Sequence, residues 1–294
     1  MTFWTTAELH RLGKSARDIT TAAESAVIRP VRKGHWATRG TDEQVIRAAR
    51  VGGVATATTA ARAIGLWTPP DPVPGQPVTA SAFRRGSRPP SRLHVAVPGT
   101  AARLRDPDDP ARALGDRSDV VVHWVAPPGL VGTGRDRIAP PLLLLAHTFA
   151  VQPPERALAV VESALLLRHL RTRDLAALAA MVPAHLRPIL AQASARADSG
   201  LETIVRTLLR ARGLRVEPLM SIDRVGEVDL LVEGRLLLEL DGREFHDDDE
   251  AFERDRRRDV EAAIGRYRVL RLSWYQVLYR WDRAETAILA ALAD

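Results

Sequence analysis

The segment from Gly226 to Gly242 constrains the fold more than any other part of the chain. Two apolar runs, at about 227–233 and 235–241, flank Glu233-Gly234 and predict a β-hairpin. Three carboxylates lie inside these runs or at their ends: Asp229, Glu239 and Asp241. Asp and Glu are poor strand formers and are costly to bury without a partner. Acids embedded in a hairpin therefore indicate a divalent metal site.

The register of this hairpin decides whether such a site can form. A two-residue turn at Glu233-Gly234 pairs Asp229 with Leu238 and places Asp229 and Glu239 on opposite faces of the sheet. A three-residue loop or a bulge brings the two carboxylates to one face. The metal-site hypothesis requires one of these. Asp241 lies two residues beyond Glu239 and projects to the same face.

Two residues outside the hairpin are further candidates. Glu202 follows Ser199 at the start of an expected helix and could add a metal ligand or hold a metal-bound water. His246 follows the second strand and could act as a general base or orient water. The alternative for His246 is a surface histidine beside acidic residues.

Residues 199–294 predict a small α/β domain with a mixed sheet. We expect helices at 201–212, 249–264 and 282–293, and strands at 214–219, 227–233, 235–241 and 267–272. On the second of these helices, Asp255 and Arg258 are three residues apart and can share a face. They either reach toward the site or form a solvated ion pair.

Several linked motifs of this domain resemble a family of very-short-patch-repair (Vsr-type) endonuclease-like domains. The matching residues are Ser199 to Glu202, Glu227 to Asp229, Glu239 to Gly242, His246, Phe252 to Arg258 and Tyr267 to Arg271. The family belongs to the PD-(D/E)xK restriction-endonuclease-like superfamily. The resemblance implies Asp229 and Glu239 as ligands of Mg²⁺ or Mn²⁺, with Glu202, Asp241 and His246 in the site.

One departure from the superfamily pattern concerns its lysine. Asp241 stands where the lysine of (D/E)xK would fall, and the only lysines of the chain are Lys14 and Lys33. The resemblance makes His246 the natural substitute, whereas Arg243 or Arg258 could supply the positive charge. An arginine stabilises a transition state but does not act as a base near neutral pH. A catalytically inactive domain is the remaining alternative.

The N-terminal 40 residues predict a winged helix-turn-helix. Thr5-x-x-Glu8 and Ser15-x-x-Asp18 are capping boxes that open two helices. Residues 27–36 predict two short strands with a turn at Lys33-Gly34. In such a motif the second helix enters the major groove, and the wing meets phosphates. The DNA-binding candidates are Arg17, Thr20, Thr21, Arg29, Arg32 and Lys33. A protein-docking role for the same motif is the alternative.

The middle of the chain predicts further α/β structure. Two helices within 41–68 complete a first domain (1–68), and a second (69–198) begins with a linker at 69–92. We expect strands at 93–97 and 119–125, helices at 139–150, 154–167 and 172–180, and a helical connector at 183–198. No catalytic constellation is visible there, and three histidines are expected to be scattered core or surface residues: His94, His123 and His147.

Residues 1–185 also resemble the antitoxin and regulator proteins of AbiE-type abortive infection systems. The matching stretches are Phe3 to Leu9, Gly34 to Trp36 and Gly52 to Leu66. That family pairs a winged helix with an α/β domain and represses its own operon. The resemblance implies DNA and a cognate toxin protein as partners.

Charge separates the chain into two parts. Residues 1–198 carry 26 Lys and Arg against 16 Asp and Glu, whereas residues 199–294 carry 16 against 20. The basic part could bind phosphate, and the acidic part could bind metal. The alternative is that the two surfaces differ in charge without a difference in function. The chain has no cysteine, which excludes disulfides, zinc fingers and thiol nucleophiles and fits the cytoplasm. No apolar run is long enough to span a membrane.

Together these features predict a metal-dependent DNA endonuclease targeted by an N-terminal winged helix, in phage defence, toxin–antitoxin biology or DNA repair. The alternative is a DNA-binding regulator or antitoxin whose nuclease-like domain is inactive. A monomer would nick one strand, whereas a homodimer could cut both.

Overall fold

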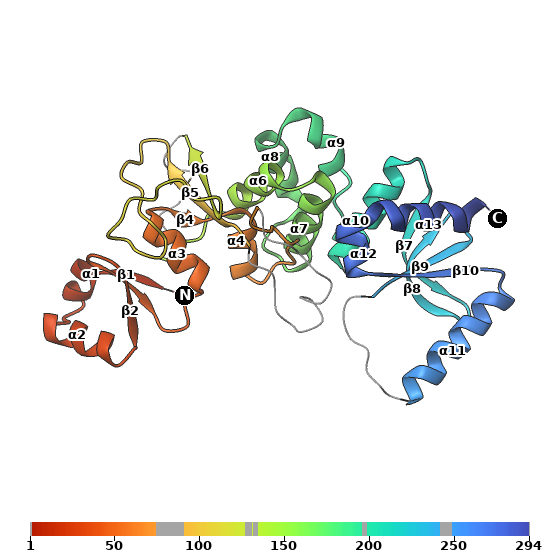
Figure 1. Ribbon diagram of the computed structural model, residues 1–294, viewed down its shortest axis with the longest axis horizontal. Coiled ribbons are helices and arrows are strands. Elements are labelled where there is room, and N and C mark those ends of the chain that lie inside the picture. The colour runs from red at the N-terminus through yellow and green to blue at the C-terminus, as the bar shows by residue number, and fades with distance from the viewer. Residues whose placement is uncertain are drawn as a thin grey trace. The chain divides into compact units, whose positions relative to one another are not determined.

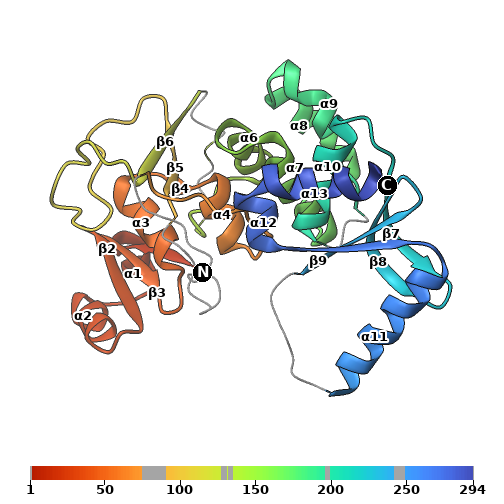
Figure 2. The same cartoon turned by 45° about the vertical axis from the view of Figure 1, so that its right-hand side comes forward.

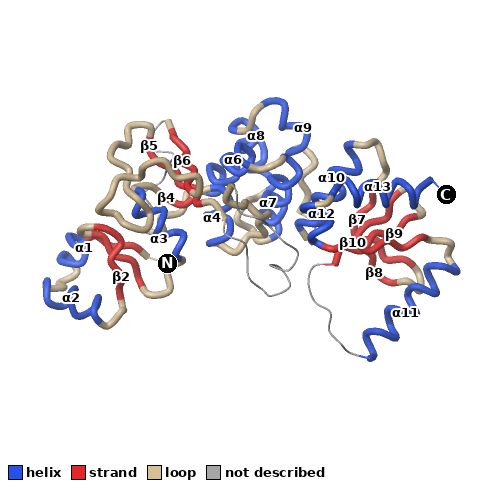
Figure 3. Tube along the Cα trace, viewed as in Figure 1, coloured by secondary structure: helices blue, strands red, loops and turns tan. Residues whose placement is uncertain are grey.

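The computed structural model describes residues 2–74, 91–126, 131, 135–195, 199–241 and 249–293, and for Asp241 and residues 249–252, 254 and 255 it describes the backbone alone. The class is mixed α/β, as expected, with three separate sheets (red in Figure 3). None of the described helices is long and apolar enough to cross a membrane.

Contacts divide the chain into two compact units (Figure 1). The first holds the described residues up to Gln152 together with His169–His185, and the second holds Pro153–Arg168 and Leu186–Asp294. The division differs from the three domains expected, because α7 (Pro154–Leu166) packs against α10 (Gly200–Ala211) in the second unit. Most of the linker expected at 69–92, residues 75–90, lies outside the described residues.

The N-terminal module of the first unit has a three-stranded antiparallel sheet and two helices. The elements are β1 (Phe3–Thr5), α1 (Thr6–Arg11), α2 (Ala16–Glu24), β2 (Ile28–Arg32) and β3 (His35–Thr38), with strand order β1-β3-β2. Both expected capping boxes are present, at Thr5 with Glu8 and at Ser15 with Asp18. Phe3, Ile19 and Val31 are among its buried residues.

The rest of the first unit surrounds a second three-stranded sheet, β4-β5-β6. Its elements are α3 (Glu43–Val51), β4 (Val54–Ala55), α4 (Ala57–Ala63), β5 (Leu93–Pro98), β6 (Val120–Val125), α6 (Pro141–Val151), a 3₁₀ turn (Thr172–Asp174) and α8 (Leu175–Met181). Strands β5 and β6 are parallel, and β4 is antiparallel to β5. Gly53 is required just before β4, because a Cβ there would lie 2.2 Å from the carbonyl oxygen of Ala96.

The second unit contains a four-stranded mixed sheet of order β10-β9-β8-β7. Its elements are α7, α9 (Arg187–Leu190), α10, β7 (Val216–Ile222), β8 (Gly226–Val232), β9 (Leu236–Asp241), α11 (Asp249–Ile264), β10 (Arg268–Ser273), α12 (Trp274–Tyr279) and α13 (Trp281–Ala293). Strands β7, β8 and β9 are antiparallel neighbours, whereas β10 is parallel to β9. Figures 1 and 2 both show α11 and α13 on opposite sides of this sheet.

The end of the chain differs from the expectation of a single helix at 282–293. Helix α12 precedes α13, because Ser273 caps it: the Gln276 N–H donates to Ser273 Oγ at 3.3 Å, and the Ser273 N–H donates to Gln276 Oε1 at 2.8 Å. This capping box is a local Ser-x-x-Gln signal. Strand β7 of the second unit begins at Val216 and ends at Ile222, whereas a strand at 214–219 was expected.

Candidate functional site

The β8–β9 hairpin closes with a three-residue loop, Glu233 to Arg235. Val232 pairs with Leu236, Leu231 with Leu237 and Leu230 with Leu238. Glu233 and Gly234 both take left-handed backbone conformations, with φ of 50° and 67°. The paired register ends at Leu230 and Leu238, and Asp229 and Glu239 are the next residues of the two strands. The structure thus has the loop length that the metal-site hypothesis requires.

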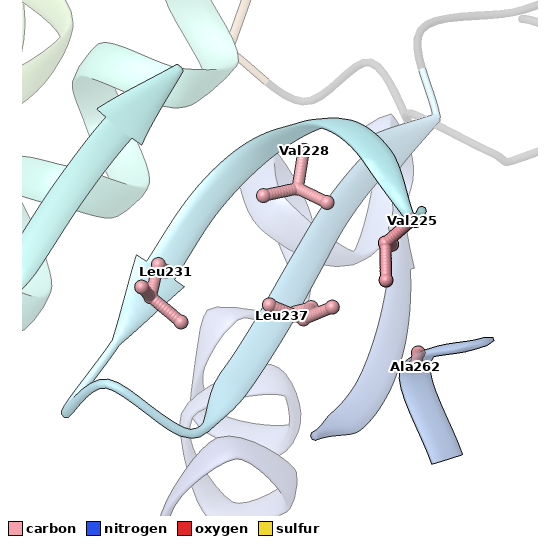
Figure 4. Close-up of a cluster of buried hydrophobic side chains, with 5 residues drawn as sticks. All are labelled: Val225, Val228, Leu231, Leu237 and Ala262. Carbon is pink, nitrogen blue, oxygen red and sulfur yellow. The ribbon is translucent and has the colours of Figure 1, made fainter. Parts of the chain in front are cut away.

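The strand pair opens at Asp229. The Leu240 N–H donates to Asp229 Oδ2 at 2.6 Å, in place of a backbone acceptor on β8. Strand β8 curves here, because Val228 and Leu231, three residues apart, both join the cluster that Leu237 and Ala262 of α11 share (Figure 4). Regular alternation would direct Val228 and Leu231 to opposite faces. The bend aims the Asp229 carboxylate at the backbone next to Glu239.

Two arginines hold the Glu239 carboxylate. Arg258 Nη2 lies 3.0 Å from Glu239 Oε1, and Arg271 Nε lies 2.6 Å from Glu239 Oε2. Arg271 Nη2 also bonds Asp259 Oδ1 at 2.6 Å. Hydrogen bonding to Asp259, and secondarily to Glu239, raises the pKa of Arg271 above its ordinary value although partial burial opposes the shift. Glu239 is therefore neutralised by two permanent cations.

Backbone carbonyls position Arg258. Its Nε donates to Val225 O at 3.0 Å, and its Nη2 donates to Glu227 O at 2.6 Å. This carries the α11 guanidinium over the bent end of β8. Arg258 thus reaches Glu239 on β9. The side chain of Asp255 lies outside the described residues, as do the side chain of Asp241 and all of His246.

Glu202 lies in the first turn of α10 and is buried. Its N–H donates to Ser199 Oγ at 3.2 Å, as the cap predicts. The next residue, Thr203, belongs to a polar cluster that the sequence did not reveal. Glu162 of α7 bonds Arg206 Nη2 at 2.6 Å and the Thr203 hydroxyl, and Glu162 and Arg206 are only 1% and 2% exposed. The sequence feature that indicates this cluster is Glu162, a single acid within an apolar stretch of α7.

The DNA-binding candidates lie on the surface of the N-terminal module. Arg17, Thr20 and Thr21 on α2 are exposed, as is Lys33 in the β2–β3 turn. The Thr20 hydroxyl donates to Ala16 O at 3.1 Å. Two candidates are less available: Arg29 Nη2 pairs with Glu43 Oε2 at 2.6 Å, and Arg32 is partly buried.

The three histidines of the first unit, which are far apart in sequence, meet in space, and His94 is buried with hydrogen-bond partners, as expected for a core histidine. His94 is fully buried and bonds the Asp71 carboxylate through Nε2. Its Nδ1 lies 3.0 Å from His123 Nε2. The His123 ring stacks on His147 with centroids 4.3 Å apart, and His147 Nδ1 lies 2.8 Å from Thr56 Oγ1. Five separate segments supply this histidine chain.

Ionisation fixes how protons are arranged along the histidine chain. Burial opposes ionisation of Asp71, but hydrogen bonds from His94 and Arg92 outweigh it and lower the pKa of Asp71. The ionised carboxylate accepts from His94 Nε2–H, so His94 Nδ1 is the acceptor for His123 Nε2–H when His94 is neutral. Burial, and then the neighbouring His147, lowers the pKa of His123 to about 3. Burial, and then His94, lowers the pKa of His147 to about 4.

No family model matches the chain, and no curated protein matches its sequence. Among the described side chains, no three His, Asp or Glu residues are grouped so as to hold a metal ion. The structure brings together Asp229, Glu239 and Arg258 of the expected site, and it adds Arg271 to them.

Proposed function

We propose that the protein is a metal-dependent endonuclease that hydrolyses phosphodiester bonds of DNA, with Asp229 and Glu239 as the metal ligands. The observation that carries the proposal is the register of the β8–β9 hairpin. The paired register ends at Leu230 and Leu238, so Asp229 and Glu239 are the next residues of the two strands, and Asp229 Oδ2 lies 2.6 Å from the amide nitrogen of Leu240. Two carboxylates next to the last paired residues of a bent strand pair can supply oxygen ligands for a divalent cation.

The donor set agrees with Mg²⁺ or Mn²⁺, because hard divalent cations prefer carboxylate oxygens. Such an ion, when bound, makes a coordinated water more acidic and neutralises charge on the phosphate. Among the described residues, Arg258 and Arg271 are the cations paired with Glu239, in a domain whose sequence has no lysine. They suit charge stabilisation and not proton abstraction. His246 stays the candidate base, with Asp241 and Glu202 as supporting acids.

Delivery to DNA is assigned to the N-terminal module. Arg17, Thr20 and Thr21 form an exposed face of α2, and Lys33 extends from the β2–β3 turn. Basic and hydroxyl side chains of this kind bond phosphate oxygens, and a helix face can read bases in the major groove. The module would then bring the second unit to a duplex.

The test is cleavage of supercoiled plasmid with Mg²⁺ or Mn²⁺. We expect nicking by the wild-type protein and a rate at least about 100-fold lower for Asp229→Ala and for Glu239→Ala, since each removes a metal ligand. Asp223→Ala is the matched control, because Asp223 is a fully exposed acid between β7 and β8. Unchanged nicking by either site variant would contradict the assignment, provided that circular dichroism shows matched folding.

A second candidate function is a DNA-binding regulator or antitoxin with an inactive nuclease-like domain. It is favoured by the two ion pairs of Glu239, which satisfy that carboxylate without a metal. A regulator would bind duplex DNA, show no Mn²⁺ binding that depends on Asp229 and cleave no substrate. Co-purification with the product of a neighbouring gene would support the antitoxin role.

A further inference from the structure

The two arginines that hold Glu239 do not depend on it for their position. Arg258 is tied to the carbonyl oxygens of Val225 and Glu227, and Arg271 is tied to Asp259. Removing the Glu239 carboxylate would therefore leave both guanidinium groups at the end of β8 and β9. They form an anchored cationic pair, not two surface side chains that happen to meet one acid.

Each guanidinium keeps donors for a further anion. Within the described residues, neither Nη1 of Arg258 nor Nη1 of Arg271 donates a hydrogen bond, and the side chains are 34% and 36% exposed. If Glu239 turned away, one N–H of Arg258 Nη2 and the Nε–H of Arg271 would also be released, while the second N–H of Arg258 Nη2 stays on Glu227 O. A guanidinium binds a phosphate through two parallel N–H groups, so the pair suits a phosphodiester.

A divalent cation and these arginines compete for one carboxylate. Each oxygen of Glu239 is already in an ion pair, so a metal ligated by Glu239 competes with a guanidinium for the charge of the same oxygen and weakens that ion pair. Repulsion between the metal and that guanidinium raises the benefit of a new anionic partner. The anion available at a nuclease site is the substrate phosphate.

We propose that Arg258 and Arg271 form the phosphate-binding pair for the nucleic acid backbone, and that Glu239 occupies this pair until a divalent cation takes its carboxylate. The proposal rests on the proposed function, because it takes Glu239 as a metal ligand. Metal binding and DNA binding then strengthen each other by the same factor, as linkage requires.

The test measures affinity for a short fluorescent DNA duplex by anisotropy, with the full-length protein, in EDTA and in Ca²⁺. Glu239→Gln removes the competing charge and keeps the side-chain shape. We expect it to raise affinity in EDTA about three- to tenfold, less than fully buried charged hydrogen bonds would give, because both guanidiniums are about one-third exposed. Ca²⁺ should raise wild-type affinity and leave Glu239→Gln nearly unchanged.

Asp223→Asn is the matched control, because it removes one negative charge from the exposed turn between β7 and β8 of the same unit. An equal gain for Asp223→Asn would mean that loss of acidity alone strengthens DNA binding and would overturn the proposal. No gain for Glu239→Gln would also overturn it. Adding Arg271→Ala to Glu239→Gln should return affinity to the wild-type EDTA value, and a gain that persists in the double variant counts against it.

Cleavage assays separate this inference from the proposed function. A protein that cleaves with Mg²⁺ but shows no gain for Glu239→Gln in EDTA is a nuclease without this arginine release. A protein that never cleaves but shows the gain, lost with Arg271→Ala, retains the phosphate-binding pair on an inactive domain.

Discussion

At the residue scale, the spacing of residues in the sequence did not predict the histidine chain of the first unit. Asp71, His94, His123, His147 and Thr56 are linked by hydrogen bonds and one ring stack. The low pKa values of His123 and His147 keep both rings neutral near pH 7. Protonation of His123 or His147 therefore destabilises the folded state.

The first prediction concerns acid stability. In the unfolded state His123 and His147 take up protons near pH 6.5, whereas in the folded state they do so only at about pH 3 and about pH 4. Their contribution to stability is complete above pH 6.5 and is lost as the pH falls toward those values. Each adds a slope of up to about 1.4 kcal/mol per pH unit below pH 6.

This slope is measured by urea unfolding at pH 7.5 and at pH 5. Pulsed hydrogen exchange of the β5 amides reports the unfolding of the first unit. The double variant His123→Gln and His147→Gln should flatten the slope. His169→Gln removes an exposed histidine of the same unit and should leave the slope unchanged. An equal pH dependence in the wild type and the double variant would rule out these histidines as its source.

At the element scale, a buried ion pair joins α7 to α10. Glu162 and Arg206 are almost fully buried, and Arg206 Nη2 lies 2.6 Å from Glu162 Oε1. The Thr203 hydroxyl and the Ser194 N–H also donate hydrogen bonds to the Glu162 carboxylate. Removing one partner leaves an unpaired buried charge, whereas replacing both with apolar side chains can be neutral. Loss of one partner should therefore cost more than loss of both.

The second prediction follows from that asymmetry. Arg206→Met should lower the free energy of unfolding of the second unit by about 3–5 kcal/mol, and Glu162→Leu by a similar amount. The double variant should recover most of the loss. Urea unfolding of the four proteins gives the coupling energy, and strictly additive losses would show that the pair does not act as a unit.

At the scale of the whole molecule, charge is unevenly divided between the basic residues 1–198 and the acidic residues 199–294. Phosphate contacts dominate the salt dependence of DNA binding, since each neutralised phosphate releases condensed cations. If the N-terminal module binds DNA, its exposed cations set that dependence.

The third prediction tests this placement. Replacing both Arg17 and Lys33 with Ala should weaken duplex binding and lower the slope of log affinity against log salt by up to about 2, near 0.9 for each phosphate that is no longer neutralised. Arg112→Ala removes another exposed cation of the first unit and should not change the slope. The slope is obtained from duplex affinities measured between low and moderate salt. An unaltered slope would place DNA binding elsewhere on the chain.

Local signals predicted much of the architecture. Capping boxes at Thr5 and Ser15 start α1 and α2, and α11 spans the 249–264 expected, because a cap or a helical period involves residues within a few positions of one another. The order helix, three strands, helix, strand of the C-terminal domain was likewise readable from apolar runs and turns. The extra helix α12 was missed although its Ser273 cap is also local.

Tertiary structure alone decided the contacts around each candidate site. The hairpin sequence allowed two registers for Asp229 and Glu239, and the three-residue loop settled which one forms. The arginine pair joins α11 and β10 to β9, and the histidine chain joins residues as far apart as Thr56 and His147. Such contacts depend on how helices pack against sheets, and packing energy is shared among many side chains distant in sequence. The sequence by itself determined the elements and the residue types available for chemistry, and packing determined which of them meet.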